Sequence, residues 1–271
     1  MAGSAAVRVL QKRGHDVAGV GRAQYDIEKE PFAKIAAASE NFEVLVNCAG
    51  VIKPLVPRLP IEAVLQVNAI FPRNLATLCA RRDQKLFHVT TDCAYSGDRG
   101  LYDETDVFDA RDLYGMSKVA GEPRDGMVLR TSIIGEERGQ ARSLLEWARA
   151  KAGQEVTGYE NHFWNGVTTV HLAEIVDDIL RRGLFAPGVF HVHSPTPVSK
   201  LELLRLISDA YDFDLRIKPG AGPEFCDRTL LSVHALSKEL ARKGLPQQLR
   251  EMRDFFRADA AAALNAGTRT P

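Results

Sequence analysis

The sequence predicts an α/β protein whose main part is a doubly wound parallel sheet, and two observations carry this prediction. Short apolar runs rich in Val, Leu and Ile alternate with segments of helical periodicity through the first two-thirds of the 271 residues. Strands separated by helices of this length favour parallel pairing, because each helix returns the chain to the same end of the sheet. A chain of this length, 45% hydrophobic and 26% charged, can bury a core without disulfides or a metal.

The segments of the first half are assigned from hydrophobic periodicity and from breaker residues at their ends. Residues 4–13 have apolar side chains at helical spacing and stop at Gly14, and residues 15–20 follow as a short strand. The remaining segments are, in order, helix 32–39, strand 43–47, helix 60–81, strand 85–90, helix 113–122 and strand 127–131. This alternation predicts helices on both faces of the sheet.

Beyond residue 132 the alternation loosens, which predicts a smaller α/β substrate lobe. Helices are expected at 143–152, 171–182 and 199–211, with a strand at 189–193. The last helix starts with a capping-box pattern, Ser199 followed by Glu202. We expect the nucleotide-binding domain to span residues 1–132 and 166–193, and the substrate lobe to span 133–165 and 194–271.

Charge and cysteine content narrow the classes of function. The 35 basic and 35 acidic residues cancel, so no net field favours nucleic acid or anionic lipid. Four scattered cysteines form no CxxC pair, and no metal-ligand cluster is apparent, His191 and His193 included. No run of about 18 apolar residues and no signal peptide is present, so we expect a cytoplasmic protein without a membrane span.

The strongest chemical signal is the string Tyr114-Gly-Met-Ser-Lys118. Residues four apart share one face of a helix, so the phenol and the ammonium point the same way. A neighbouring ammonium is expected to lower the pKa of Tyr114 and to make it a general acid for a substrate carbonyl. Thr91 is expected at the carboxyl end of a strand, where open α/β sheets bind their ligands.

Residues 89–122, VTTDCAYSGDRGLYDETDVFDARDLYGMSKVAGE, resemble the active-site stretch of extended short-chain dehydrogenases/reductases. They are most similar to the dTDP-4-dehydrorhamnose reductase family of sugar-nucleotide reductases. The resemblance implies a Rossmann-like domain in which Thr91 hydrogen-bonds the substrate oxygen, Tyr114 delivers the proton and Lys118 holds the nicotinamide ribose. It implies NAD(P)H-dependent reduction of a keto group on a dTDP- or UDP-linked deoxysugar, in surface polysaccharide or rhamnose-type sugar biosynthesis. A homodimer is compatible with it.

Further cofactor contacts follow from the same resemblance. Asn47, Ala49 and Gly50 are similar to the family's Asn-x-Ala-Gly stretch beside the cofactor, and Asn68 is similar to a helix-borne Asn near the active site. A second set lies at the amino-terminal side: Gly3, Arg22 and Asp26. Arg22 can fork onto a 2′-phosphate, which favours NADPH over NADH, and Asp26 is similar to the carboxylate beside the adenine.

The amino-terminal end departs from the family pattern, which has a strand and then Gly-x-x-Gly-x-x-Gly. Met1-Ala2-Gly3-Ser4 aligns only with the last glycine. In the strand order 3-2-1-4-5-6 of dinucleotide-binding sheets, the first strand of the chain lies in the middle of the sheet. Its absence would leave the two strands beside it about 9.6 Å apart. We therefore expect the start to be an internal methionine of a longer product, or else a sheet that closes up or borrows a strand.

Substrate contacts are expected from Thr91, Asp92, Trp164, Asn165 and Arg228. Rings and amides around Trp164 suit a sugar and a flat base, and Arg228 lies where relatives carry an Arg near the nucleotide phosphates. Two alternatives stay open. One is an epimerase or dehydratase with bound NAD, in which Asp92 or Glu104 would act as acid or base, although Cys93 after Asp92 favours simple reduction. The other is a non-catalytic binding or regulatory homologue.

Overall fold

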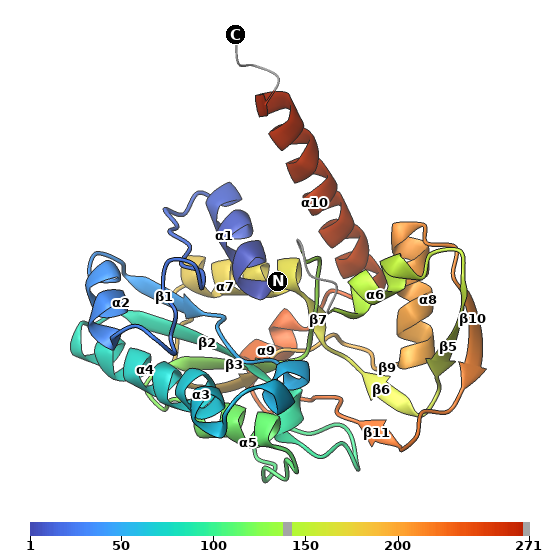
Figure 1. Cartoon of the computed structure of the whole chain (residues 1–271), viewed down its shortest axis with the longest axis horizontal. Helices are drawn as coiled ribbons and strands as arrows, with labels where there is room; N and C mark the ends of the chain where they lie inside the picture. Colours follow the sequence, from blue (N-terminus) through green and yellow to red (C-terminus); the bar gives the residue numbers. More distant parts are fainter. Residues whose placement is uncertain (138–142, 268–271) are drawn as a thin grey trace.

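The computed structural model describes the backbone of residues 1–137 and 143–267, with side chains described as far as residue 259. Its centre is a parallel sheet in the order β1-β2-β3-β8 (Figure 1). The four strands are β1 (Val44–Asn47), β2 (Lys85–Thr91), β3 (Met127–Thr131) and β8 (Gly188–His191). The predicted α/β class with a parallel Rossmann-like sheet is therefore confirmed.

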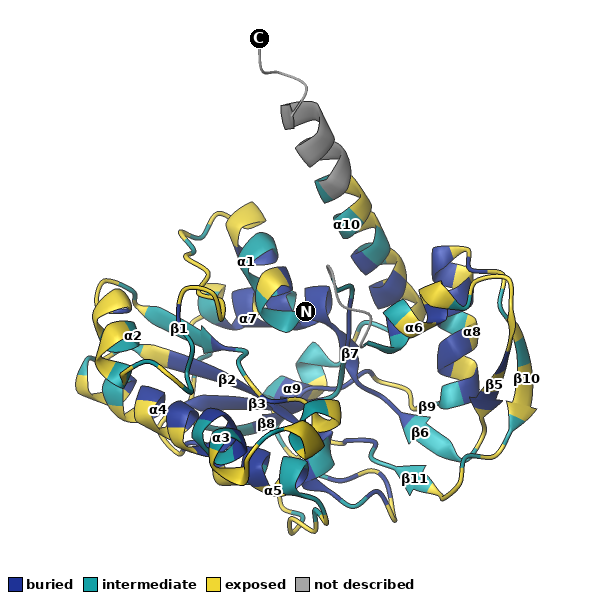
Figure 2. Ribbon diagram, in the orientation of Figure 1, coloured by how far each residue is buried: buried dark blue, intermediate teal, exposed yellow. Residues whose placement is uncertain are grey.

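Burial on both faces explains why the central strands read as continuous apolar runs. All of β3 is buried, and β2 is buried from its second residue onward (Figure 2). Phe87 and Leu129 face a core shared with Ile179, whereas Leu86 faces a second core shared with Phe71 and Leu75. Parallel sheets covered on both faces have this pattern, because neither side of the strand meets water.

Helices cover the sheet in two layers. On one face, α1 (Ala2–Lys12) packs against α7 (Thr169–Arg181). The other face is covered by α3 (Ile61–Leu65), α4 (Phe71–Arg81) and α5 (Leu113–Ala120) (Figure 1). The buried carboxylate of Asp177 ties the first layer together, since it accepts hydrogen bonds from Arg13 at 2.9 Å and Arg181 at 2.8 Å. Gly14 follows α1 with a φ of +88°, as its predicted place at the helix end requires.

The strand expected at residues 15–20 is wrong. This segment has no strand structure and is mostly exposed, with Val20 at 52% exposed. Among the described residues no strand lies beside it, so extended pairing would leave its backbone groups without partners. It stays largely in water instead, where the Gln11 amide donates to the Val17 carbonyl at 3.1 Å and the His15 ring bonds the Asp177 carboxylate at 2.6 Å. β1 pairs directly with β2, with Val44 opposite Lys85, and the sheet neither borrows a strand nor contains a gap.

The predicted helix 60–81 exists but is interrupted. It consists of α3 (Ile61–Leu65), one π-helical turn (Gln66–Ile70) and α4 (Phe71–Arg81). A π turn inserts an extra residue into a helix and often marks a functional site. Here it contains Asn68, which is completely buried.

The smaller lobe consists of four short paired strands with β9, and of two helices, α6 and α8, at the right of Figure 1. In it β5 (Glu155–Tyr159) pairs in parallel with β10 (Arg216–Gly220), and β6 (His162–Trp164) pairs with β11 (Cys226–Asp227) and β9 (Val198–Ser199). Its helices are α6 (Leu144–Ala150) and α8 (Lys200–Tyr211). The hydroxyl of Ser199 caps α8 by accepting from the backbone N–H of Glu202 at 3.1 Å, as the capping pattern predicts.

Several further elements complete the structure. They are α2 (Phe32–Ala38), β4 (Ile133–Ile134), β7 (Val167–Thr168), α9 (Ala235–Leu240), α10 (Leu245–Gly267) and the 3-10 turns Lys53–Arg58 and Asp92–Ala94. One core cluster contains Val9 of α1, Leu203 of α8 and Leu249 of α10, so apolar packing is continuous across the predicted boundary. The exact domain limits stay a prediction.

Three general features of the described part bear on function. None of its helices is long and apolar enough to span a membrane. It holds no group of three or more His, Cys, Asp or Glu side chains placed to bind a metal ion. Its four cysteines are free thiols.

Candidate active site

The candidate site lies where the end of β2 meets the start of α5. Asp112 caps α5 by accepting from the backbone N–H of Gly115 at 2.8 Å. A Cβ on Gly115 would lie 2.2 Å from the carbonyl oxygen of Cys93, so only glycine allows the helix to lie against the chain leaving β2. This close approach brings Tyr114 to Thr91, as the sequence predicts.

Tyr114 and Thr91 interact in the structure, but the pKa of Tyr114 is shifted opposite to the sequence prediction. Burial raises the pKa of Tyr114, because it penalises the phenolate, and the nearby Cys93 and Asp92 act in the same direction. Hydrogen bonding with Thr91 opposes the rise. The expected lowering by Lys118 is therefore wrong here: desolvation exceeds any stabilisation of the phenolate. The phenol is protonated at neutral pH.

Lys118 carries a buried ammonium that makes one hydrogen bond among the residues that the structure describes. It is 5% exposed, and its Nζ donates to the carbonyl oxygen of Val89 at 3.3 Å. Burial lowers the pKa of Lys118 to about 8, although the charge of Glu122 and the Cys48 thiol oppose this. A Cβ on Gly50 would lie 3.3 Å from Nζ, so the backbone of the exposed Gly50 lies close to the ammonium.

Asn68 was expected to contact the cofactor, but its amide is occupied. Its Oδ1 accepts from the backbone N–H of Val51 at 2.8 Å, and its Nδ2 donates to the Val51 carbonyl at 3.2 Å and to Ser117 Oγ at 3.0 Å. A Cβ on Gly121 would lie 1.9 Å from the Asn68 carbonyl oxygen, which shows how closely α5 approaches the π turn. Asn68 therefore holds the loop after β1 against α5, and direct cofactor contact is not supported.

In the stretch Asn47–Gly50, the Asn47 side chain is bonded within the protein, whereas the backbone of Ala49 and Gly50 is accessible. The Asn47 amide bonds to His88 Nδ1 at 3.1 Å and accepts from the Ala49 backbone N–H at 3.1 Å, so it shapes the turn. Burial and Lys118 hold the pKa of His88 well below its usual value. Gly50 is exposed and Ala49 partly so, which leaves their backbone free to approach a cofactor.

Gly3 lies in the first turn of α1, against the loop after β1. A Cβ on it would lie 3.6 Å from the Cβ of Cys48, so the amino end of α1 meets the carboxyl edge of the sheet. This end of a helix favours phosphate.

Arg22 and Asp26 lie close together in the segment between α1 and α2. Arg22 donates to Asp26 at 3.3 Å and to Glu28 at 2.9 Å, and its side chain is 66% exposed. Glu28 was not singled out from the sequence. Two carboxylates therefore compete with any 2′-phosphate for this guanidinium, and the contact expected from Arg22 stays a prediction.

The substrate residues expected in the smaller lobe are largely structural. Both polar ends of the Asn165 amide bond the backbone of Leu230, at 2.7 and 2.9 Å, so substrate contact by Asn165 is not supported. Trp164 is 5% exposed and belongs to the core cluster with Leu203, which leaves its ring little surface for a ligand.

Arg228 does reach the active site, but its nitrogens are bonded within the protein. Nε donates to the Tyr95 carbonyl and Nη2 to the Ser96 carbonyl, both at 2.8 Å, and Nη1 lies 3.1 Å from Cys226 Sγ. It faces Asp92, which is 8% exposed and whose pKa burial raises, against the opposing charges of Arg228 and Lys200. Asp92 thus lies at the site as expected.

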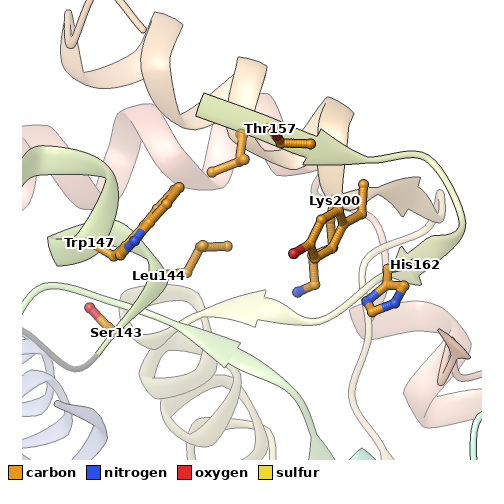
Figure 3. A pocket seen from close by; sticks show the side chains of 8 residues that line it. Ser143, Leu144, Trp147, Thr157, His162 and Lys200 are labelled. Carbon is orange, nitrogen blue, oxygen red and sulfur yellow. The ribbon is translucent and has the colours of Figure 1, made fainter. Parts of the chain in front are cut away.

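Sequence reasoning missed a cavity of about 500 Å³ in the smaller lobe. It lies between α6, β5, β6 and α8 and is lined by Ser143, Leu144, Trp147, Thr157, Tyr159, His162, Lys200 and Leu204 (Figure 3). Lys200 connects it to the catalytic end, because its charge interacts with Asp92 and Cys93. A signal for Lys200 was present: it directly follows the cap Ser199, and a cation is unfavourable at a helix amino terminus.

This parallel sheet, with Thr91, Tyr114 and Lys118 at its carboxyl edge, defines an α/β protein of the short-chain dehydrogenase/reductase class. The model of the RmlD substrate binding domain family matches residues 1–251. The chain belongs to this family.

Individual proteins agree with this placement. A dTDP-4-dehydrorhamnose reductase of Mycolicibacterium smegmatis is 28% identical, over 96% of this chain and 82% of the relative. The structure of a dTDP-4-dehydrorhamnose reductase from Bacillus anthracis in complex with NADP superposes with a TM-score of 0.77 at 19% identity, covering 94% of each chain. MoeE5 in complex with UDP-glucose and NAD has a TM-score of 0.74 at 16% identity, covering 96% of each chain.

Proposed function

We propose that this protein is an NADPH-dependent reductase of a keto group on a nucleotide-linked deoxysugar, of the dTDP-4-dehydrorhamnose reductase kind. The single observation that carries the proposal is the convergence of Thr91, Tyr114 and Lys118 at the end of β2. Membership of the RmlD substrate binding domain family and the names of the similar proteins support it.

The chemistry follows from the protonation of these groups. The substrate oxygen would accept hydrogen bonds from the hydroxyls of Thr91 and Tyr114, and Tyr114 would donate the proton as the carbonyl becomes an alcohol. The raised pKa of Tyr114 keeps that proton on the phenol until the oxygen becomes basic. NADPH, when bound, supplies the hydride.

Lys118 and the loop after β1 are proposed to hold the nicotinamide ribose. The ammonium has donors left beyond its bond to Val89, and the exposed Gly50 of the loop after β1 lies close to it. Preference for NADPH is proposed from Arg22, in keeping with NADP in the Bacillus anthracis structure, whereas MoeE5 carries NAD.

The setting of the reaction is proposed from the composition. A dTDP- or UDP-linked sugar is the expected substrate, and nucleic acid and membrane are not expected partners of a chain without net charge. Free thiols suit the reducing cytoplasm, and the pathway would make a surface polysaccharide or a rhamnose-type sugar. A homodimer is the proposed assembly.

The proposal is tested by following NADPH absorbance with a dTDP-4-keto-6-deoxy sugar. The native protein should oxidise NADPH stoichiometrically, and Tyr114→Phe should lower kcat about 10²- to 10⁴-fold with little change in substrate binding. Tyr211→Phe, a buried tyrosine at the carboxyl end of α8, is the matched control. A Tyr114→Phe variant with more than about a tenth of native kcat would contradict the role of Tyr114. Product formation without NADPH consumption would instead identify an epimerase or dehydratase.

A further inference from the structure

Two side chains of β2 are buried with a polar atom that has no hydrogen-bond partner among the described residues. They are His88, with Nε2 at 0% exposure of the residue, and Thr90, with Oγ1 at 5% exposure. Residues two apart on a strand face the same way, so both lie on the face of the sheet that α4 and α5 cover, together with Leu86. A buried polar atom without a partner destabilises the fold, so each of these atoms calls for a partner.

The hydrogen bonds around His88 define which ring nitrogen carries its proton. Asn47 Oδ1 accepts from the backbone N–H of Ala49 at 3.1 Å, so Asn47 Nδ2 faces His88 Nδ1, also at 3.1 Å. Nδ1 must therefore accept, which leaves the proton on Nε2. Burial and the charge of Lys118 hold the pKa of His88 well below its usual value, so the ring is neutral at pH 7. Nε2 is thus a buried donor that lacks an acceptor.

Lys118 reaches the same place from α5. Its Nζ donates to the carbonyl oxygen of Val89, the residue between His88 and Thr90, at 3.3 Å. An ammonium has three donors, so two remain after this bond. A donor of Lys118 and the Nε2 donor of His88 cannot satisfy each other, because neither group can accept. An acceptor between them would satisfy both.

The titratable and polar groups around Lys118 do not supply this acceptor. Glu122, just after α5, is held in a buried ion pair by hydrogen bonds of 3.0 and 2.6 Å. Tyr114, one turn earlier on α5, is a neutral phenol bonded with the end of β2. Burial raises the pKa of Cys48, in the loop after β1, to about 11, so its thiol is neutral. In the π turn, the amide of Asn68 is bonded at both its oxygen and its nitrogen.

We propose that one water molecule binds between His88, Thr90 and Lys118, and that His88 thereby positions the ammonium of Lys118. The water accepts from Nε2 of His88 and from Nζ of Lys118, and it donates to Oγ1 of Thr90. About three hydrogen bonds to otherwise unsatisfied groups are usual for a buried water. The three donors of Lys118 then divide among the Val89 carbonyl, this water and the nicotinamide ribose. Only the ribose contact rests on the proposed function, since the water site follows from the side chains themselves.

The proposal is tested by NMR titration of the free chain with isotope-labelled lysine side chains, and Lys118→Met assigns the signal. His88→Leu removes both ring nitrogens. The pKa of Lys118, about 8 when buried, should then fall by about one unit, because the ammonium loses a hydrogen-bond acceptor that stabilises its charge.

Two conservative variants separate the two ring nitrogens of His88. His88→Asn places an amide where Nδ1 lies and keeps a partner for Asn47, but it has no group at the position of Nε2. The pKa of Lys118 should therefore fall as it does in His88→Leu. His88→Gln places an amide nitrogen near the position of Nε2 and should restore the native pKa. Thr90→Val keeps the shape of its side chain and removes the hydroxyl, so it should also lower the pKa of Lys118 without changing His88.

His171→Asn is the matched control. His171 is a second buried histidine whose Nε2 has no partner among the described residues, but it lies on α7, which packs on the opposite face of the sheet. The pKa of Lys118 should not change in this variant.

Three results would overturn the proposal. The first is a native pKa of Lys118 in both His88→Asn and Thr90→Val. The second is an equal fall in His88→Asn and His88→Gln, which would show that His88 only packs the core. The third is a crystal structure of the native chain without a water in hydrogen-bond distance of His88 Nε2. None of these measurements requires turnover, so a chain that fails to oxidise NADPH would overturn the proposed function and leave the water site standing.

Discussion

The carboxyl end of β2 with α5 and the segment that follows α1 are both expected to bind the dinucleotide, yet they are built differently. In α5, Gly115, Ser117 and Lys118 are buried, and two glycines bring its backbone against other elements. Residues 15–24 have no buried side chain and no regular strand, and Arg22 is held by two surface ion pairs. The first region places its groups by packing, and the second by contacts that water can replace.

The difference teaches where a binding site can be deduced from one structure. A side chain locked by backbone contacts keeps its position when a ligand arrives, so Tyr114 and Lys118 can be assigned roles from geometry. Exposed ion pairs are worth little, typically below about 1 kcal/mol, so Arg22 can exchange its carboxylates for a phosphate. Three substitutions test this contrast, and they are given in order of expected effect.

Glu122→Gln should have the largest effect. Arg130 is 1% exposed at its side chain and Glu122 is 6% exposed, and two hydrogen bonds of 3.0 and 2.6 Å join them. Removing one charge leaves the other buried and unpaired, so the free energy of unfolding should fall by about 3–5 kcal/mol in urea titration. The matched Glu155→Gln breaks an exposed pair with Lys218 and should cost less than about 1 kcal/mol. Equal losses in the two variants would contradict the packing contrast.

Lys118→Met should stabilise the protein while abolishing turnover. The pKa of Lys118 falls from an ordinary 10.5 to about 8 on folding, which destabilises the native state at pH 7 by about 3 kcal/mol. The unfolded chain binds the extra proton between pH 8 and 10.5, so this penalty is complete below pH 8 and disappears as pH rises to 10.5. Urea titration at pH 7 and pH 10 should therefore show a gain for the variant at pH 7 that shrinks at pH 10. No gain at pH 7 would mean that the ammonium is hydrated.

Arg22→Leu should have the smallest effect on folding and a selective effect on binding. The free energy of unfolding should change by less than about 0.5 kcal/mol, because the side chain is exposed. NADPH should bind about tenfold more weakly, and NADH should bind as before, since only NADPH carries the 2′-phosphate. Fluorescence titration with both nucleotides measures this, with Arg81→Leu as a remote control. An unchanged NADPH affinity would remove Arg22 from the cofactor site.

Local patterns in the sequence predicted those parts of the fold that depend on local physics. Alternating apolar runs located β2 and β3, Gly14 marked the end of α1, and Ser199 marked the start of α8. The spacing of Tyr114 and Lys118 placed both on one helix face because that relation is a property of the helix alone. The prediction of a strand at residues 15–20 was wrong because a strand needs a neighbouring strand to pair with, and the hydrophobic pattern of a segment does not show whether one is present.

Polar side chains were harder to assign than elements. Asn68 and Asn165 have the residue type of a ligand contact, but their amides are satisfied by backbone groups distant in the sequence. The direction of the pKa shift of Tyr114 depends on burial, which the string Tyr-x-x-x-Lys does not contain. Lys200 stood out only as a cation at the wrong end of a helix.

The two tight glycine contacts of α5 have a consequence for motion. Gly115 touches the carbonyl of Cys93 and Gly121 that of Asn68, so the helix is fastened at both ends with Tyr114 and Lys118 close to these contacts. Local opening of α5 would have to separate both backbone contacts at once. Its amide hydrogens should therefore exchange with solvent deuterium only when the whole protein unfolds, and far more slowly than those of residues 15–24.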